Sequence, residues 1–200
     1  MPRPFPYRSS ITCRWIVACA GALLILAAAG CQSAPSMPST APAQGPAPGL
    51  MPLTWNSQVL AQCAPPVGWA PQPLESGSRH TEQLWLSPST NTAYGVAHIN
   101  LPLPLAIIGI DRVLNGIVDD MADKQKSATV LYRQDDPRLP GLHVEIKGGD
   151  YRVRANLTAS GWDGWFVYAS TSNDDPIDQK ELDLAQSARD HTILSLRSGK

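Results

Sequence analysis

In the middle and at the end of the chain, hydrophobic residues recur with a period of two in some short stretches and with a helical period in others. Apolar and polar positions alternate, or β-branched and aromatic residues gather, in six stretches that we expect to be β-strands. These predicted strands are Glu82–Ser87, Ala93–Asn100, Ala128–Gln134, Leu142–Lys147, Tyr151–Ala159 and Trp165–Thr171. The connections contain Pro, Gly, Ser and Asn, as in Ser87–Asn91 and Gly161–Gly164. Such connections favour antiparallel neighbours.

Two stretches have the spacing or the end signals of helices. In the first, apolar residues recur at helical intervals and polar residues occupy the opposite side, which predicts an amphipathic helix with one buried face. Its apolar members are Ile110, Val113, Leu114, Ile117, Val118 and Met121. The second helix is expected to begin with Asp175 as N-cap, Pro176 at the first helical position and Asp178 at the third. We expect it to end near His191.

The pair Gly148-Gly149 predicts a two-residue hairpin turn, because glycine adopts positive φ without strain. Such a turn would place Ile146 opposite Tyr151 on the apolar side of the sheet. By the same register, Val144 would lie opposite Val153 and Leu142 opposite Ala155. On the polar side, Glu145 would face Arg152, and His143 would face Arg154.

The order strand, strand, helix, strand meander, helix predicts an α+β domain. In this class an antiparallel sheet has helices packed on it. The expected domain spans residues 55–200. The strand Trp165–Thr171 is apolar on both faces, so we expect other elements to cover each side of it.

Residues 1–30 have the three parts of a secretory signal peptide. Arg3, Arg8 and Arg14 precede an apolar run from residue 15 to residue 29, and small residues follow. The run is short of the roughly 20 residues that a membrane-spanning helix needs. We therefore favour a cleaved signal peptide over an uncleaved membrane anchor.

The residues Ala28-Ala29-Gly30-Cys31 resemble the lipobox of bacterial lipoproteins, with Ala28 where that family usually has Leu. The resemblance implies that Cys31 becomes the lipid-bearing first residue, with acyl chains of the palmitate type. Several such chains anchor a protein firmly. Two alternatives stay open: ordinary cleavage with secretion, and a Cys31–Cys63 disulfide. Under lipidation Cys63 is a lone thiol, which we expect to be a small buried apolar residue.

Residues 31–54 are expected to form the lipidated cysteine and a proline-rich tether. The segment lacks charge and apolar periodicity, and prolines recur every few residues. This composition favours extended polyproline II, with a rise of about 3.1 Å per residue. A spacer of this kind would hold the domain away from a membrane.

The charge balance argues against nucleic acid as a partner. The predicted signal peptide removes three of the 16 basic residues and none of the 17 acidic ones, which leaves a net charge near −4. Non-specific nucleic-acid binding needs a basic surface that displaces counterions from phosphates.

The sequence contains no motif that predicts catalysis, a cofactor or a metal. We therefore expect no catalytic, cofactor-binding or metal-binding residues, and no enzymatic activity. His80, His98, His143 and His191 lack ligand spacing, and nucleophile elbows, phosphate-binding glycine loops and calcium loops are missing. Trp162 and Trp165 flank a turn and either form an exposed aromatic edge or pack against the end of the sheet.

The element order, with the motif Pro66-Val67-Gly68-Trp69, resembles the PsbP-like group, which includes DcrB-like envelope lipoproteins. The resemblance spans roughly residues 64–196. It implies a sheet sandwiched between helices and a non-enzymatic role in scaffolding or binding at a membrane surface. It supplies no catalytic residues.

The sequence thus predicts a non-catalytic envelope lipoprotein that binds a protein or envelope component. We expect it to face the periplasm, held by its lipid anchor in the outer membrane rather than the inner one. The alternative is a small periplasmic hydrolase or ligand-binding protein. A pocket lined by two or more of His98, His143, Asp135 and Asp136 would favour that alternative.

Overall fold

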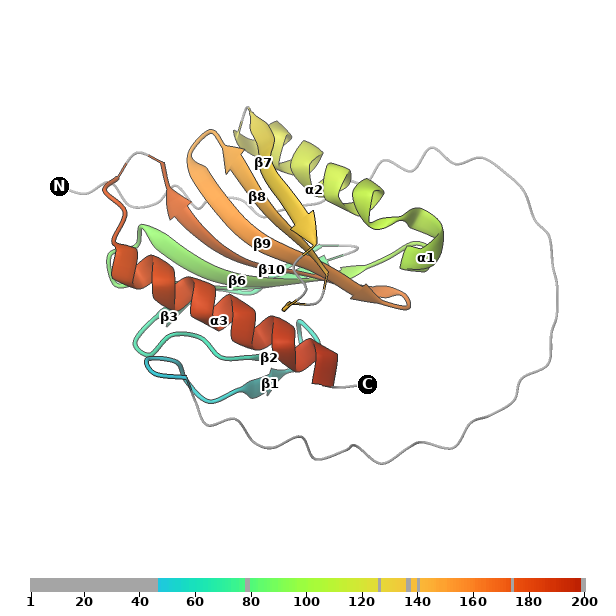
Figure 1. The fold of residues 1–200 in the computed structure, drawn as a ribbon. Coiled ribbons are helices and arrows are strands. Elements are labelled where there is room, and N and C mark those ends of the chain that lie inside the picture. The colour runs from blue at the N-terminus through green and yellow to red at the C-terminus, as the bar shows by residue number, and fades with distance from the viewer. Residues whose placement is uncertain are drawn as a thin grey trace, which may run out of the picture.

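The computed structural model describes residues 47–77, 80–125, 127–135, 138–139, 141–173 and 175–198. In these ranges the chain forms an antiparallel sheet with a long helix on each face (Figure 1). The expected α+β class is confirmed. The strands are β1 (Thr54–Asn56), β2 (Ala61–Cys63), β3 (Ala70–Pro71), β4 (Glu75–Ser76), β5 (His80–Leu86), β6 (Thr92–Asn100), β7 (Ala128–Asp135), β8 (Leu142–Gly148), β9 (Tyr151–Ser160) and β10 (Asp163–Ser172). The helices are α1 (Leu105–Ile108), α2 (Ile110–Gln125) and α3 (Gln179–Ser198).

The main sheet has eight strands in the order β3-β5-β6-β10-β9-β8-β7, with β4 also paired to β5. After β6 the chain passes through α1 and α2 and enters the sheet again at the far edge, as β7. It then returns strand by strand until β10 pairs with β6 along their whole lengths, from Thr171 opposite Thr92 to Asp163 opposite Asn100. The centre of the sheet is therefore made by two segments that are distant in the sequence.

Each face of the sheet has its own hydrophobic core. The core under α2 includes Phe166 and Tyr168 of β10, whereas the core under α3 includes Val167 and Ala169 of the same strand. Side chains alternate between the two faces of a strand, so a strand in the middle of a two-sided core has to be apolar throughout. The expectation that this strand is covered on both sides is confirmed.

The six predicted strands and the amphipathic helix all exist, and their ends lie within two residues of the predicted positions for the strands. The predicted turn at residues 87–91 connects β5 to β6. There Thr90 adopts a φ of 63°, and its N–H donates to the carbonyl of Ser87 at 2.9 Å. Ser89 N–H also donates to Glu181 Oε1 at 3.2 Å, which connects this turn to the first turn of α3.

Packing against the domain begins before Trp55. Leu50 is buried in the core under α3 and forms an isolated bridge with Pro66. The hairpin of β1 and β2 follows, and Ala61 and Cys63 are buried in the same core. Strands of three residues are too short to show a periodicity, so the sequence did not reveal this hairpin.

The predicted two-residue turn at Gly148-Gly149 is wrong. Lys147 lies opposite Arg152 and Ile146 opposite Val153, so four residues, 148–151, separate the last pair. Neither Gly148 nor Gly149 is among the described residues with positive φ. The partners are shifted by two residues relative to the prediction, and a shift of two keeps every side chain on its expected face.

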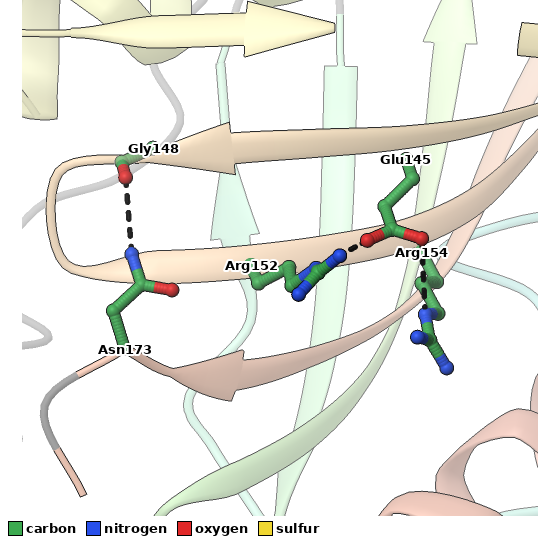
Figure 2. A network of polar contacts seen from close by, with 5 residues as sticks. All are labelled: Glu145, Gly148, Arg152, Arg154 and Asn173. Carbon is green, nitrogen blue, oxygen red and sulfur yellow. Dashed lines mark hydrogen bonds and ion pairs between the residues drawn. The ribbon is translucent and has the colours of Figure 1, made fainter. Parts of the chain in front are cut away.

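A side chain from outside this hairpin supports the wider turn. Asn173, which follows β10, donates from Nδ2 to the carbonyl of Gly148 at 3.1 Å (Figure 2) and to the carbonyl of Gly149 at 3.1 Å. Its own N–H donates to the carbonyl of Asp150 at 2.8 Å. These contacts satisfy carbonyls that a tight turn would pair locally, and they come from a residue remote in the sequence.

The predicted start of the last helix is also corrected. Asp178, not Asp175, is the N-cap, because its Oδ1 accepts from the N–H groups of Lys180 at 2.9 Å and Glu181 at 3.2 Å. The helix then continues past His191 to Ser198. Within the described ranges, no helix combines the length and the apolarity needed to cross a membrane.

Candidate functional site

The fold places His98 away from the other described residues proposed to line a pocket, His143 and Asp135. His98 lies on β6 and its Nε2 is 2.8 Å from Oδ1 of Asp163, whereas His143 lies on β8. Strands β9 and β10 separate those two strands. Asp135 is exposed at the end of β7, and Asp136 lies outside the described residues. In the described ranges no group of three His, Cys, Asp or Glu residues is placed to hold a metal.

The remaining histidines lie on different elements. His80 is buried at the start of β5, and His191 is half-buried on α3. The four histidines of the chain thus occupy three strands and one helix.

Cys63 is a buried free thiol, as expected. Burial raises its pKa to about 12, even though a hydrogen bond with Tyr94 acts in the opposite direction. Burial also raises the pKa of Tyr94, whose hydroxyl lies 2.6 Å from the hydroxyl of Thr192 on α3. A thiol with so high a pKa remains protonated near neutral pH and is a poor nucleophile. Cys31, the predicted lipidation site, lies outside the described residues.

The polar surface of the sheet lies on β7, β8 and β9, on the face that α3 covers only in part. Asn156 is opposite Val167 and Arg154 is opposite Ala169, and both partners belong to the core under α3. Beyond that core the same face carries polar side chains. We call this surface the open face and define it by Tyr132, Gln134, His143, Glu145, Lys147, Arg152 and Arg154; Asn156 is on the same side of the sheet but is fully buried.

Glu145 is at the centre of the open face, between two arginines (Figure 2). Its Oε1 accepts from Nε of Arg152, and its Oε2 accepts from Nε of Arg154 at 3.3 Å. The Glu145 side chain is 14% exposed, while the Arg152 and Arg154 side chains are 45% and 36% exposed. Because the arginines use Nε toward the carboxylate, their terminal nitrogens are left to face solvent or a partner.

A second set of contacts connects β7, β8 and β9 across the open face. Nδ1 of His143 lies 3.2 Å from Oδ1 of Asn156, and the rings of Tyr132 and His143 meet edge to face with centroids 5.9 Å apart. The Tyr132 hydroxyl also donates to Oε1 of Gln134. These contacts fix a row of polar groups on a rigid sheet instead of on loops.

The open face carries more donors than acceptors. Lys147, Arg152 and Arg154 supply three positive charges against the one carboxylate of Glu145. A surface with this balance fits a ligand or partner that supplies negative charge and acceptor oxygens.

The open face ends at an edge strand that is irregular. Strand β7 pairs only with β8 in the described sheet, and the register shifts between Val130 and Tyr132, so that Leu131 is the extra residue. Leu131 and Tyr132 are 49% and 44% exposed. A bulge of this kind increases local twist and makes an edge less suitable for pairing with another strand.

Trp162 and Trp165 have different environments. Trp162, in the turn between β9 and β10, is 57% exposed. Trp165 packs against the core under α3, and its Nε1 donates to the carbonyl of Val59 at 3.1 Å. Of the two alternatives, packing therefore holds for Trp165, while Trp162 is exposed.

Sequence reasoning identified the residues of the open face as polar but did not identify the face as a site. The alternation in residues 142–147 and 151–159 separates polar from apolar side chains correctly. The missing information was how far α3 extends over the sheet, because this depends on tertiary packing. No family model matches the chain, and no curated protein is similar to it.

Proposed function

We propose that the protein is an exported envelope lipoprotein, anchored through Cys31, that binds an acidic partner through the open face and catalyses no reaction. The observation that carries the first part is the sequence of residues 1–54. A basic segment, a short apolar run, Ala28-Ala29-Gly30-Cys31 and an uncharged proline-rich stretch follow one another in the order expected for a tethered lipoprotein.

The charge distribution supports the second part. The expected mature chain is acidic overall, with 13 basic and 17 acidic residues, yet the open face has three cations and one carboxylate. Charge complementarity then favours a partner with carboxylate or phosphate groups.

Metabolic labelling with a fatty-acid analogue tests the anchor. We expect the wild type to be labelled and Cys31→Ser to be unlabelled. Cys63→Ser is the matched control, because it removes the other cysteine of the mature chain and should remain labelled. Equal labelling of wild type and Cys31→Ser would contradict the anchoring proposal.

Retention from a detergent extract of the host envelope tests the partner. We expect Arg152→Glu/Arg154→Glu to lose partners that the wild type retains at low salt, since exposed charge pairs are screened by salt. Arg112→Glu, an exposed arginine on α2 at the opposite face of the sheet, is the control. Equal loss in both variants would mean that net charge, and not the open face, determines binding.

A further inference from the structure

One end of the sheet carries three exposed apolar side chains that the proposed function does not use. Leu103, Ile107 and Trp162 are 46%, 69% and 57% exposed. The first two lie in the segment that leads into α1 and in α1 itself, and the third lies in the β9–β10 turn. Figure 1 shows α1 and this turn at the same end of the molecule. We call these three residues the apolar end.

A backbone hydrogen bond fixes the two segments together. The N–H of Leu101 donates to the carbonyl of Trp162 at 2.8 Å, and Asn100 lies opposite Asp163 in the sheet. Leu101 itself is buried in the core under α2. The backbone of the β9–β10 turn is therefore joined to the segment that leads into α1 at the end of a strand pair in the centre of the sheet.

The two sequence segments that carry the apolar end contain no charged residue. Residues 101–110 and 155–162 contain no Asp, Glu, Lys or Arg. Asp163 is the adjacent carboxylate, and its Oδ1 lies 2.8 Å from Nε2 of His98 on the sheet. Exposed Leu, Ile and Trp side chains at one end of a sheet, on segments without charged residues, are typical of a surface that enters the interfacial layer of a bilayer.

The tether is long enough to let the apolar end reach the membrane. The described chain starts at Ala47, and Gly49 packs against Leu184 in the first half of α3, at the end of the sheet away from Trp162. The ten residues of β10 separate the two ends by about 33 Å. The 15 residues from Gln32 to Pro46, at the predicted polyproline II rise, extend to about 47 Å.

We propose that the apolar end inserts into the interface of the membrane that carries the lipid anchor. This inference rests on the proposed anchoring, and it adds a second contact that orients the domain. With Leu103, Ile107 and Trp162 in the lipid interface, β10 extends outward from the membrane surface. The open face, which runs along β7–β9, then remains accessible from the periplasm.

The test uses the lipidated protein in vesicles of phosphatidylethanolamine and phosphatidylglycerol, with a fluorescent label at Ile107→Cys. Cys31 is blocked by lipid in this protein, and Cys63 is buried with a raised pKa, so the label goes to the new cysteine. Leu131→Cys, an exposed apolar position on β7, is the matched control. We expect brominated lipids to quench the label at position 107 severalfold more than the label at position 131.

A second variant tests whether quenching at position 107 requires insertion of the apolar side chains, or only closeness of the domain to the membrane. Adding Leu103→Ser and Trp162→Ser to Ile107→Cys should abolish the difference in quenching, while circular dichroism shows that the fold is kept. Equal quenching at the two labelled positions, or protection at position 107 that appears only with a host membrane protein, would overturn the inference. If the protein carries no lipid anchor, that result contradicts the proposed function instead. In that case, co-sedimentation of the unlipidated chain with the same vesicles tests the apolar end alone.

Discussion

At the scale of single residues, Glu145 shows how burial changes the value of an ion pair. Its side chain is 14% exposed and contacts both Arg152 and Arg154, so its charge is held in a partly desolvated position. By contrast, Arg133 and Asp111 form an ion pair whose side chains are 46% and 61% exposed. Exposed pairs contribute about 0–1 kcal/mol, whereas hydrogen bonds to charged groups contribute up to about 3 kcal/mol.

We expect Glu145→Gln to lower the free energy of unfolding by about 1 kcal/mol, because the arginines lose their counter-charge in a half-buried place. Asp111→Asn, the control, should lower it by about 0.5 kcal/mol or less. Urea denaturation of both variants measures the two values. Similar small effects would mean that the Glu145 carboxylate is solvated in solution.

The sequence could predict the neighbours of Glu145 only in part. Alternation placed Glu145, Arg152 and Arg154 on one face, and the pairing with Arg152 exists as a diagonal contact. The residue directly opposite is Arg154, because the turn is wider than two residues. The contacts of Asn173 that support this turn come from the end of β10, and no local pattern reports them.

At the scale of elements, the start of α3 was placed three residues too early. Asp175, Pro176 and Asp178 offer two competing helix starts, and both satisfy the local rules for a cap. The packing of Leu182 and Ala185 against the sheet, and the contact of Glu181 with Ser89, lie one to two turns into the observed helix. Tertiary contacts therefore select the later start.

We expect Asp178→Ala to lower the free energy of unfolding by about 1 kcal/mol, since it removes the acceptor for two helix N–H groups. Asp175→Ala should change it by less than about 0.5 kcal/mol, because Asp175 is exposed and precedes the helix. Thermal unfolding of the two variants compares them. A larger effect for Asp175 would support the cap predicted from the sequence.

At the scale of the whole molecule, the fold class, the six long strands and α2 could be predicted because their periodicities are long enough to read. The order of the strands in the sheet could not. It depends on β10 returning to pair with β6, across two intervening helices and three strands. The open face and the apolar end both depend on this order, so the sequence did not indicate the open face and indicated only Trp162 of the apolar end.

The same order predicts a gradient of protection in hydrogen exchange. Amides of β6 and β10 should exchange slowest, because each of these strands is paired on both sides and covered by a core on both faces. Amides of β7 should exchange faster, since this edge strand pairs only with β8 in the described sheet. Mass spectrometry of peptides from the three strands measures this, and equal protection of β7 and β10 would contradict the strand order.

The pairing of β6 with β10 also affects when the chain can fold. The centre of the sheet cannot form until residues 163–172 are available to pair with residues 92–100. The core under α3 cannot form until residues 179–198 are available to form that helix. Topologies dominated by such distant contacts fold slowly. A chain that emerges N-terminus first therefore stays open until it is nearly complete. Under the proposed export, this delay would keep the chain in a form that can thread through a translocation channel.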